Sequence, residues 1–367
     1  MKLKLYFDKY LLKINSIFIS LLLIFGFFLV SSATAVESQR IYDDSFYMIK
    51  NHSVAVFIGL IMFMIIRNLN TSYISYFSRT LIVLISVVLF ILITYGENLN
   101  GSTRWLDIGI AVIQPSEFAK PIILLWVASQ LSNNEINESD IKTVWRTIFM
   151  PGLAAALMLF QPDFGMAATI AFIVFIQLLF SKIKVIYPLL ISILGSFLGW
   201  FLLVQAEYRD NRLKTWIERT CDQGEELLNK CYQIHQSRIA ISSGGMTGLG
   251  PGTSRARWGS LPHAYSDFIS SIIGEEYGFI GYLVFIFILS LCILSFFLIA
   301  VRTKDQFKKV FIAGLGAWIL FQSILNLGAS VYLLPVTGIV LPFVSYGGSA
   351  MVSIFIALGI MYSNANE

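Results

Sequence analysis

Ten long apolar runs constrain the fold of this 367-residue chain more than any other feature of its sequence. A helix needs about 20 apolar residues to cross the hydrocarbon core of a bilayer. The runs lie near 14–35, 53–67, 80–95, 117–131, 147–161, 165–181, 183–204, 268–301, 308–334 and 343–363. Only 13% of the residues are charged, against about 25% in soluble domains. The sequence therefore predicts an all-α polytopic membrane protein with about ten transmembrane helices.

These runs leave no room for a separate soluble domain. The longest stretch between them covers residues 205–266, between the seventh and eighth runs. We therefore expect one membrane domain over residues 1–367, with 205–266 as a large loop within it. The net charge of +4 is small and the basic residues lie between apolar runs, so nothing indicates a nucleic-acid partner.

Lys and Arg are unevenly distributed among the short loops, and this bias predicts the orientation of the chain. With a cytoplasmic N-terminus, the inner segments hold 14 Lys and Arg residues, and the outer short loops hold only Arg40, Lys50 and Arg104. An even number of spans places the C-terminus in the cytoplasm too. The large loop then lies on the outer side of the membrane, which would be the periplasm if the chain is a bacterial inner-membrane protein, as the resemblance described below implies.

The N-terminus allows a second interpretation. Lys2–Lys13, the apolar run after them and Ala33-Thr34-Ala35 resemble a secretory signal with a small-residue cleavage site. The run is long for such a signal, so we favour a retained first span. Cleavage would not change the sidedness of the other segments.

The cysteines and histidines limit the covalent and metal chemistry. Cys221 and Cys231 share the large loop, where an oxidising periplasm permits a disulfide with Cα atoms within about 7 Å. Cys292 lies in an apolar run and is expected to pack there. With only three histidines in the chain, we predict no His-rich metal site.

Polar residues in or beside membrane spans are costly, so they are candidates for function. The first outer cluster holds Arg104 and Trp105, followed by Glu117 and Lys120 at the start of the fourth run. Glu117 and Lys120 are three positions apart and share a helix face. They could bind substrate, or they could form a helix entry with an intrahelical ion pair.

Two further outer motifs carry charge. Asp163 lies in Gln161–Gly165, which joins two apolar runs, and its other interpretation is a tight turn that caps the next helix. Arg238 lies in the large loop, where it could contact an anionic headgroup or be a solvated surface residue.

The eighth and tenth runs begin with the remaining candidates. Asp267 opens the eighth run, where N-capping is the competing explanation, and Glu275 and Glu276 follow about two turns later. Two adjacent carboxylates at that depth need partners or water. The motif Ser345-Tyr346-Gly347-Gly348 could bind substrate, or its glycines could allow close helix packing.

Taken in order, these motifs resemble the FtsW/RodA family, also called SEDS proteins, from about Gly101 to the end of the chain. The matching pieces are Arg104-Trp105-Leu106, Gln114-Pro115-Ser116-Glu117 with Lys120, Gln161–Gly165, Ser266-Asp267-Phe268 with Glu275–Gly278, and Leu341-Pro342 with Ser345–Ser349. The resemblance implies ten spans and a peptidoglycan glycosyltransferase that joins lipid II into glycan strands beside a class B penicillin-binding protein. The family's essential Asp and Trp fall on Asp267 and Trp105.

The sequence departs from the family where the large loop ends. The family often has Glu, His and Thr where this chain has His263, Tyr265 and Ser266, so support of Asp267 by the usual Glu and His is absent. The segment 250–254 looks like FtsW, whereas 236–240 looks more like RodA. The balance favours an FtsW-like protein, active in cell division or elongation.

The implied mechanism uses Asp267 as general base toward the acceptor sugar hydroxyl. Arg104, Lys120 and Arg238 would offset the charge of the lipid diphosphate, and a divalent cation, Mg²⁺ or Mn²⁺, stays an option. No other cofactor is expected.

Two other functions remain open from the sequence: a lipid II flippase, or a non-catalytic scaffold of the divisome or elongasome. A flippase needs polar groups toward both membrane faces, whereas the dense polar motifs of this chain lie on the predicted outer face. Other membrane proteins of those assemblies are expected as partners, at the division septum if the chain is FtsW-like.

Overall fold

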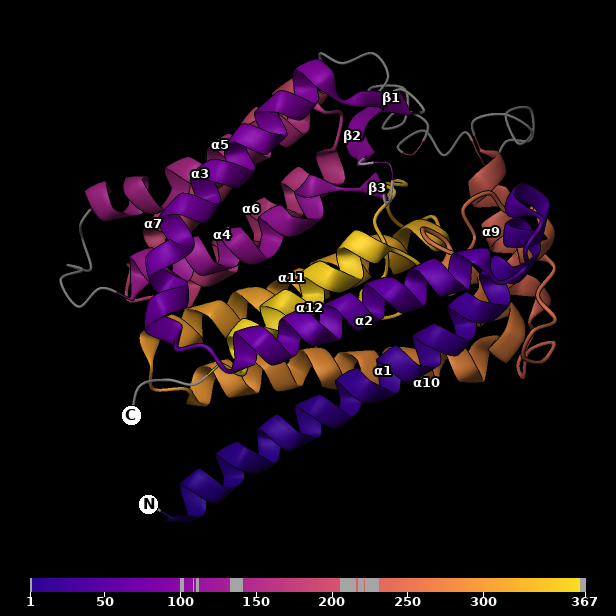
Figure 1. The fold of residues 1–367 in the computed structure, drawn as a ribbon, viewed down its shortest axis with the longest axis horizontal. Coiled ribbons are helices and arrows are strands. Elements are labelled where there is room, and N and C mark those ends of the chain that lie inside the picture. Colours follow the sequence, from indigo (N-terminus) through magenta and orange to yellow (C-terminus); the bar gives the residue numbers. More distant parts are fainter. Residues whose placement is uncertain are drawn as a thin grey trace.

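The computed structural model describes residues 2–99, 102–107, 109, 112–132, 141–204, 216, 221 and 231–363. They form a helical bundle with a small antiparallel sheet at one end (Figure 1). The helices are α1 (Lys2–Tyr42), α2 (Tyr47–Arg67), α3 (Thr71–Tyr95), α4 (Pro115–Leu131), α5 (Ile141–Phe160), α6 (Phe164–Leu179), α7 (Ile186–Val204), α9 (Tyr232–Ser243), α10 (Ile269–Arg302), α11 (Gln306–Ser330) and α12 (Gly348–Met361). The sheet has the order β1 (Glu97–Leu99), β2 (Ser102–Asp107), β3 (Val112–Ile113), and a short 3-10 helix, η2, covers Ala256–Trp258.

In the described part of the chain, every helix except α9 coincides with one of the ten predicted apolar runs. Six of them, α1, α2, α3, α5, α10 and α11, are long and apolar enough to cross a membrane. Helix α6, the described part of α7 and α12 are apolar but shorter. The all-α, multi-pass membrane fold is confirmed, and ten crossings remain a prediction.

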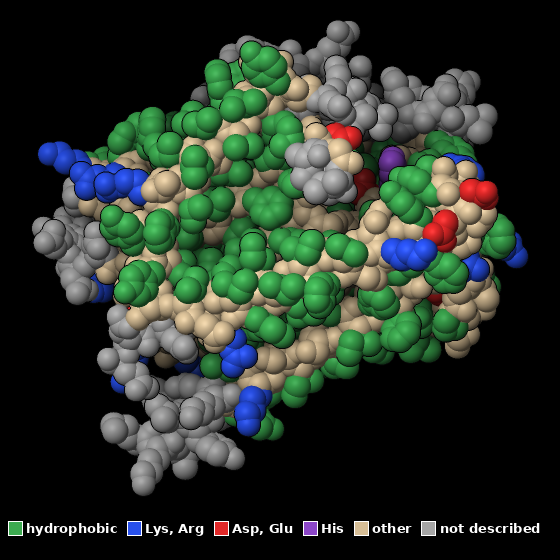
Figure 2. Space-filling view, viewed as in Figure 1, with side chains coloured by type: hydrophobic (Ala, Val, Ile, Leu, Met, Phe, Trp, Pro, Cys, Tyr) green, Lys and Arg blue, Asp and Glu red, His purple; other side chains and the backbone are tan. Residues whose placement is uncertain are grey.

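The two ends of the bundle differ. Both termini lie at one end, whereas the sheet and α9 lie at the other (Figure 1). Hydrophobic side chains cover the flank of the bundle, and charged side chains gather toward its ends (Figure 2). Termini at the same end agree with an even number of crossings.

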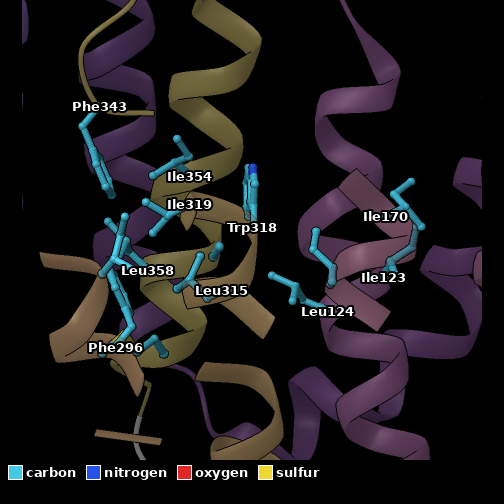
Figure 3. Packing of buried hydrophobic residues seen from close by; sticks show 14 of the residues in the cluster. Ile123, Leu124, Ile170, Phe296, Leu315, Trp318, Ile319, Phe343, Ile354 and Leu358 are labelled. Carbon is cyan, nitrogen blue, oxygen red and sulfur yellow. The ribbon is translucent and has the colours of Figure 1, made fainter. Parts of the chain in front are cut away.

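Helix α11 is the centre of the bundle, with 72% of its apolar window buried. It packs against α4, α6 and α10. Figure 3 shows Leu315 and Trp318 of α11 between Leu124 of α4 on one side and Leu358 of α12 on the other. Close approach requires small residues here, because a Cβ on Gly314 would lie 2.4 Å from Leu124.

Helices α2 and α3 follow each other in sequence but belong to different parts of the bundle. Helix α2 packs mainly on α12 and α1, whereas α3 packs on α4 and α5 (Figure 1). Only 17% of the apolar window of α2 is buried, and its exposed side chains include Phe57, Ile61 and Met64. These apolar faces are suited to contact lipid chains.

Helix α10 is interrupted in its N-terminal third at Gly278, which has φ 66° and ψ −169°. The segment 245–250 lies against this break and replaces the lost helical hydrogen bonds. Two of its N–H groups donate to the carbonyls of Glu275 and Glu276, both at 3.0 Å, and two of its carbonyls accept from the first two N–H groups after Gly278. A Cβ on Gly278 would lie 2.3 Å from the backbone nitrogen of Gly248, so only glycine fits.

A loop of residues 331–347, the C-terminal loop, connects α11 to α12. The prediction that the last apolar run becomes helical from 343 is wrong by several residues, because α12 begins at Gly348. Phe343 has a positive φ of 67° and is buried at 1% exposure. A Cβ on Gly26 of α1 would lie 2.5 Å from the Phe343 carbonyl oxygen. Packing against α1 therefore holds this apolar stretch as a loop.

The predicted disulfide between Cys221 and Cys231 is confirmed, with a Cα–Cα distance of 5.3 Å. The rest of the large loop from 205 to 230, apart from Trp216, lies outside the described residues. The two cysteines are buried in a small apolar cluster with Tyr332 and Val336 of the C-terminal loop. The disulfide closes a segment of the large loop on itself, and its apolar packing holds that segment against the C-terminal loop.

Candidate active site

Asp267 sits in a tight turn, residues 263–268, directly before α10. The carbonyl of His263 accepts hydrogen bonds from the N–H groups of Ser266, Asp267 and Phe268 at 3.1 to 3.4 Å. His263 has a positive φ of 58°, which turns its carbonyl toward these donors. The turn therefore fixes the backbone of Asp267.

The C-terminal loop holds this turn from the other side. The amide of Asn326 donates to the carbonyls of both Asp267 and Ile339 at 2.8 Å. The hydroxyl of Ser345 donates to the Ser266 carbonyl at 2.6 Å and accepts from the Leu341 N–H at 2.8 Å. These bonds explain why Ser345 is buried. Its hydroxyl positions the Asp267 turn.

The ring of Tyr346 packs at the same junction. Its N–H donates to the Tyr265 carbonyl at 3.0 Å, and its ring lies edge-on to Tyr265 and stacks on His52 of α2. Burial raises the pKa of the Tyr346 phenol to about 12, so the hydroxyl stays protonated at neutral pH. The motif that contains Ser345 and Tyr346 is thus first a support for the turn.

The Asp267 side chain is half-buried. Phe268, and not Asp267, holds the N-cap position of α10. The capping explanation is therefore wrong. Gly338, with φ +70°, lies beside the carboxylate, and a Cβ there would be 3.6 Å from Asp267 Oδ2. Glycine leaves space next to this oxygen.

A charge cluster of Arg104, Glu117, Lys120 and Asp163 lies at the starts of α4 and α6. Lys120 Nζ donates to Glu117 Oε2 at 2.6 Å, and both side chains are almost fully buried. The Lys120 ammonium also lies 4.5 Å from the Trp318 ring centroid and is attracted by the Asp163 carboxylate. The predicted intrahelical pair is present, and it is buried in the bundle.

Arg104 connects the sheet to the turn before α6. Its guanidinium donates to the carbonyls of Gln161 and Pro162, and its Nε lies 3.7 Å from Asp163 Oδ2. Asp163 is also the N-cap of α6, where Oδ1 accepts from the Met166 N–H at 3.2 Å. The capping prediction for Asp163 is confirmed, and the same carboxylate faces the charge cluster.

The C-terminal loop brings Asp267 and the charge cluster to one region. Ile339 and Thr337 pack so closely on the start of α6 that a Cβ on Gly165 would lie 2.6 and 3.1 Å from them. Gly338, between these two residues, touches Asp267. The polar motifs predicted on one face therefore surround one loop.

The other predicted site residues are placed less directly. Trp105 is partly buried on β2, next to Arg104. Arg238 is exposed on α9, whereas its neighbour Ser237 faces α10 and bonds the Ser271 hydroxyl at 2.7 Å. Gly347 is the N-cap of α12, and Gly348 packs on Ala55 of α2. The glycine pair therefore serves helix packing.

Glu275 and Glu276 lie just before the break in α10 and are 1% and 2% exposed. Glu275 accepts from the Ser254 hydroxyl at 2.6 Å and from the N–H groups of Arg255 and Ala256 at 3.0 and 3.2 Å. Glu276 accepts from the Ser254 N–H at 3.4 Å. The two buried carboxylates therefore have the hydrogen-bond partners that the sequence analysis required, and the large loop supplies them.

Two site residues were missed by the sequence analysis. Asn326 lies inside an apolar helix and His52 inside another, and polarity in a membrane span is the signal that could have identified both. Within the described ranges, no three His, Cys, Asp or Glu side chains are grouped as a metal site would require.

Comparison with known proteins gives consistent matches. The FtsW/RodA/SpoVE family model, described as cell cycle protein, matches residues 13–367. The chain is 32% identical over 347 residues to the probable peptidoglycan glycosyltransferase FtsW of Haemophilus influenzae, covering 93% of this chain and 86% of that protein. It is 31% identical over 350 residues to stage V sporulation protein E of Bacillus subtilis, covering 93% of each chain.

Solved structures show the same fold. A chain of a peptidoglycan synthase complex, described by its structural coordination of polymerization and crosslinking, matches with a TM-score of 0.75 and 22% identity over 95% of both chains. The rod shape determining protein RodA of Thermus thermophilus matches with a TM-score of 0.69 and 22% identity, over 95% of this chain and 94% of RodA.

Proposed function

Because this chain belongs to the FtsW/RodA/SpoVE family of cell cycle proteins, we propose that it is a peptidoglycan glycosyltransferase that polymerises lipid II into glycan strands. The observation that carries this proposal is Asp267, half-buried and held through its backbone, near the charge cluster, in which Arg104 and Lys120 are balanced by Asp163 and Glu117. Asp267 offers a base, and the partly exposed Arg104 offers a cation.

The reaction requires one bond to form and one to break. The acceptor sugar hydroxyl attacks the anomeric carbon of the donor, and the bond from that carbon to the lipid diphosphate breaks. Asp267 accepts the hydroxyl proton, and the diphosphate leaves with the bonding electrons. Gly338 has no side chain beside Asp267 Oδ2, and a bound hydroxyl would approach the carboxylate through that space.

Negative charge builds on the departing diphosphate, and a cation beside it would stabilise that charge. Arg104 is partly exposed at the sheet and is the member of the charge cluster that can touch substrate. Lys120 is fully buried and already neutralised by Glu117, so it serves to position this group. Arg238 is the candidate cation on the α9 side, and a Mg²⁺ or Mn²⁺ ion brought by the diphosphate would add to the same effect.

The arrangement of α2 and α3 supports a lipid-linked substrate. Their exposed apolar faces could take the long chain of the lipid while its sugars reach Asp267. The starts of α4 and α6, which carry the charge cluster, lie toward the end with the sheet, opposite the termini (Figure 1). A flippase would need comparable polar groups along the whole path, so the polymerase is favoured.

The protein is a multi-pass membrane protein. We place both termini in the cytoplasm and the Asp267 side in the periplasm, on the Lys and Arg bias of the loops. A class B penicillin-binding protein is the proposed partner, because a similar chain occurs in a peptidoglycan synthase complex. Other divisome or elongasome proteins at the septum would complete the assembly.

The test is polymerisation of labelled lipid II by the purified protein, alone and with its penicillin-binding partner. We expect glycan strands from the wild type and none from Asp267→Asn. A folded wild-type protein that makes no strands even with the partner would contradict the proposal, and transfer of labelled lipid II between vesicle leaflets would then favour the flippase.

A further inference from the structure

A cavity of about 250 Å³ lies on the side of the 263–268 turn that faces α1. None of the four residues of the charge cluster lines it. We call it the Arg257 cavity. It is lined by Ala33, Glu37, Arg40, Arg257, Gly259, Leu261, Pro262, His263, Ala264 and Tyr265.

The walls of the Arg257 cavity carry both signs of charge. Arg40 pairs with Glu37 at 2.8 Å on α1, and the Arg40 guanidinium lies against Gly259, whose Cβ would be 3.3 Å away. Arg257 donates from Nη1 to the Ser32 hydroxyl at 2.8 Å. Two guanidiniums against one carboxylate leave the cavity with net positive charge.

Arg257 is only partly satisfied by the protein. Its Nε–H is buried and has no hydrogen-bond acceptor among the described residues. Glu276 attracts the guanidinium from the far side but has its own backbone donors at Gly252 and Ser254. A buried donor without an acceptor is costly unless a ligand or water supplies one.

The side chain of Tyr265 lies between the cavity and Asp267. Tyr265 lines it, and the charges of Glu37 and Asp267 both act on the Tyr265 phenol. Burial raises the pKa of this phenol first, and the two carboxylates raise it further. The hydroxyl therefore stays protonated and can donate to a ligand.

The size and charge of the cavity define the ligand. Its volume is below the roughly 300–1,000 Å³ of pockets that enclose a whole drug-sized ligand, so it suits one arm of a large substrate. Guanidiniums bind carboxylates, and Glu37 can bind an ammonium group. A short peptide that carries carboxylates and an amino group matches this set of partners.

We propose that the Arg257 cavity binds the peptide of the lipid-linked disaccharide substrate and thereby aligns its sugar with Asp267. This inference rests on the proposed function and adds a specificity site to it. A peptide carboxylate accepts from Arg257 Nε–H, and its amino group lies toward Glu37. The sugar to which the peptide is attached is then held on the Asp267 side of Tyr265.

The test compares two substrates, lipid II and the same lipid diphosphate disaccharide without peptide. Arg257→Gln should raise the KM for lipid II roughly tenfold, the size of one lost charge-assisted hydrogen bond, with kcat little changed. The KM for the peptide-free substrate should stay at its wild-type value. Arg257→Lys, which keeps the charge, should recover part of the loss.

Arg255→Gln is the matched control, since Arg255 is exposed in the same stretch and bonds Glu275 only through its backbone N–H. It should leave both substrates unaffected. If Arg257→Gln folds poorly, Arg40→Gln gives the same comparison from a side chain that is 65% exposed. Equal losses on both substrates would overturn the proposal.

If the wild-type enzyme does not use the peptide-free substrate, a competition experiment replaces the comparison. Soluble stem pentapeptide should then inhibit wild-type polymerisation and inhibit Arg257→Gln much less. Absence of wild-type inhibition would overturn the cavity assignment alone. A wild type inactive on lipid II would overturn the proposed function instead, so the two failures are distinguishable.

Discussion

Asp267 and the pair Glu275–Glu276 belong to the same end of α10, yet their surroundings differ. The glutamates are at most 2% exposed, and the side chain of Glu275 accepts three hydrogen bonds within 3.2 Å. Asp267 is half-buried and is held through its backbone carbonyl and N–H, with a glycine beside its carboxylate. A carboxylate that accepts from fixed donors of the large loop serves the fold, whereas we assign the chemical role to the more exposed carboxylate of Asp267.

The difference arises from position relative to the large loop. Segment 252–256 closes over the glutamates and supplies its N–H groups, whereas Asp267 lies before the helix, where Gly338 of the C-terminal loop lies beside its carboxylate. Of the three acidic residues at this end of α10, Glu275 and Glu276 are therefore structural, and Asp267 is the candidate base.

Asp267→Asn should have the largest effect, and it tests whether the Asp267 carboxylate is the general base. A general base contributes about 10²–10⁴-fold to a rate, and Asn cannot accept the proton, so strand synthesis should fall at least ~100-fold. The unfolding temperature should hardly change, because the backbone contacts remain. Polymerisation of labelled lipid II and thermal unfolding measure the two effects.

Asp43→Asn is its control, because Asp43 is exposed between α1 and α2 and has a positive φ of 54° that Asn tolerates. It should match the wild type in both measurements. Asp267→Asn with near wild-type strand synthesis would remove the general-base role.

Lys120→Met extends the comparison to a carboxylate that is neutralised by a lysine. It leaves Glu117 buried without its partner and should lower the free energy of unfolding by about 3–5 kcal/mol. Glu117→Gln combined with Lys120→Met should recover much of this loss, as measured by denaturant unfolding in detergent. If the single variant is as stable as the wild type, the pair is not isolated from water as described.

Glu275→Gln tests the structural side directly. Its amide NH₂ would replace one carboxylate oxygen and face the Arg255 N–H at Oε1 or the Ser254 hydroxyl and Ala256 N–H at Oε2, so the free energy of unfolding should fall by about 1–3 kcal/mol. Activity per folded molecule should be retained, the reverse of Asp267→Asn. Glu276→Gln should be milder, since the Ser254 N–H contact to Glu276 is 3.4 Å long. Loss of turnover in well-folded Glu275→Gln protein would break the comparison.

Gly338→Ala should have the smallest effect and probes the space beside Asp267. A side chain at φ +70° costs about 1 kcal/mol of stability. Its Cβ would lie 3.6 Å from Asp267 Oδ2 and restrict a bound hydroxyl, so polymerisation should fall modestly. Gly109→Ala is matched, with φ +81° and nothing within 4 Å of its Cβ. Equal activity in the two variants would show that the space is not used.

The sequence predicted the helices because their cause is local. Runs of apolar residues locate the ten segments, and Asp163 and the two loop cysteines carry their capping and pairing chemistry in their own side chains. The site needed contacts between distant segments. Asn326 reaches across to Asp267, and no periodic pattern marks a residue that bonds two loop carbonyls.

The apolar stretch at Phe343 shows the same limit. It looks like the start of a span, but the close approach of α1 at Gly26 keeps it in a loop. Likewise, nothing distinguishes Gly278 from other helical glycines until the 245–250 segment is placed beside it.

The exchange of backbone hydrogen bonds at Gly278 has a consequence for biosynthesis. A helix that enters a membrane with unpaired N–H and C=O groups is penalised by several kcal/mol per group. Segment 245–250 precedes α10 in the chain, so it emerges from the ribosome first and can be translocated before that helix inserts. When α10 inserts, the segment that pairs with its broken hydrogen bonds has therefore already been synthesised. The order of the two segments in the chain suits this pairing.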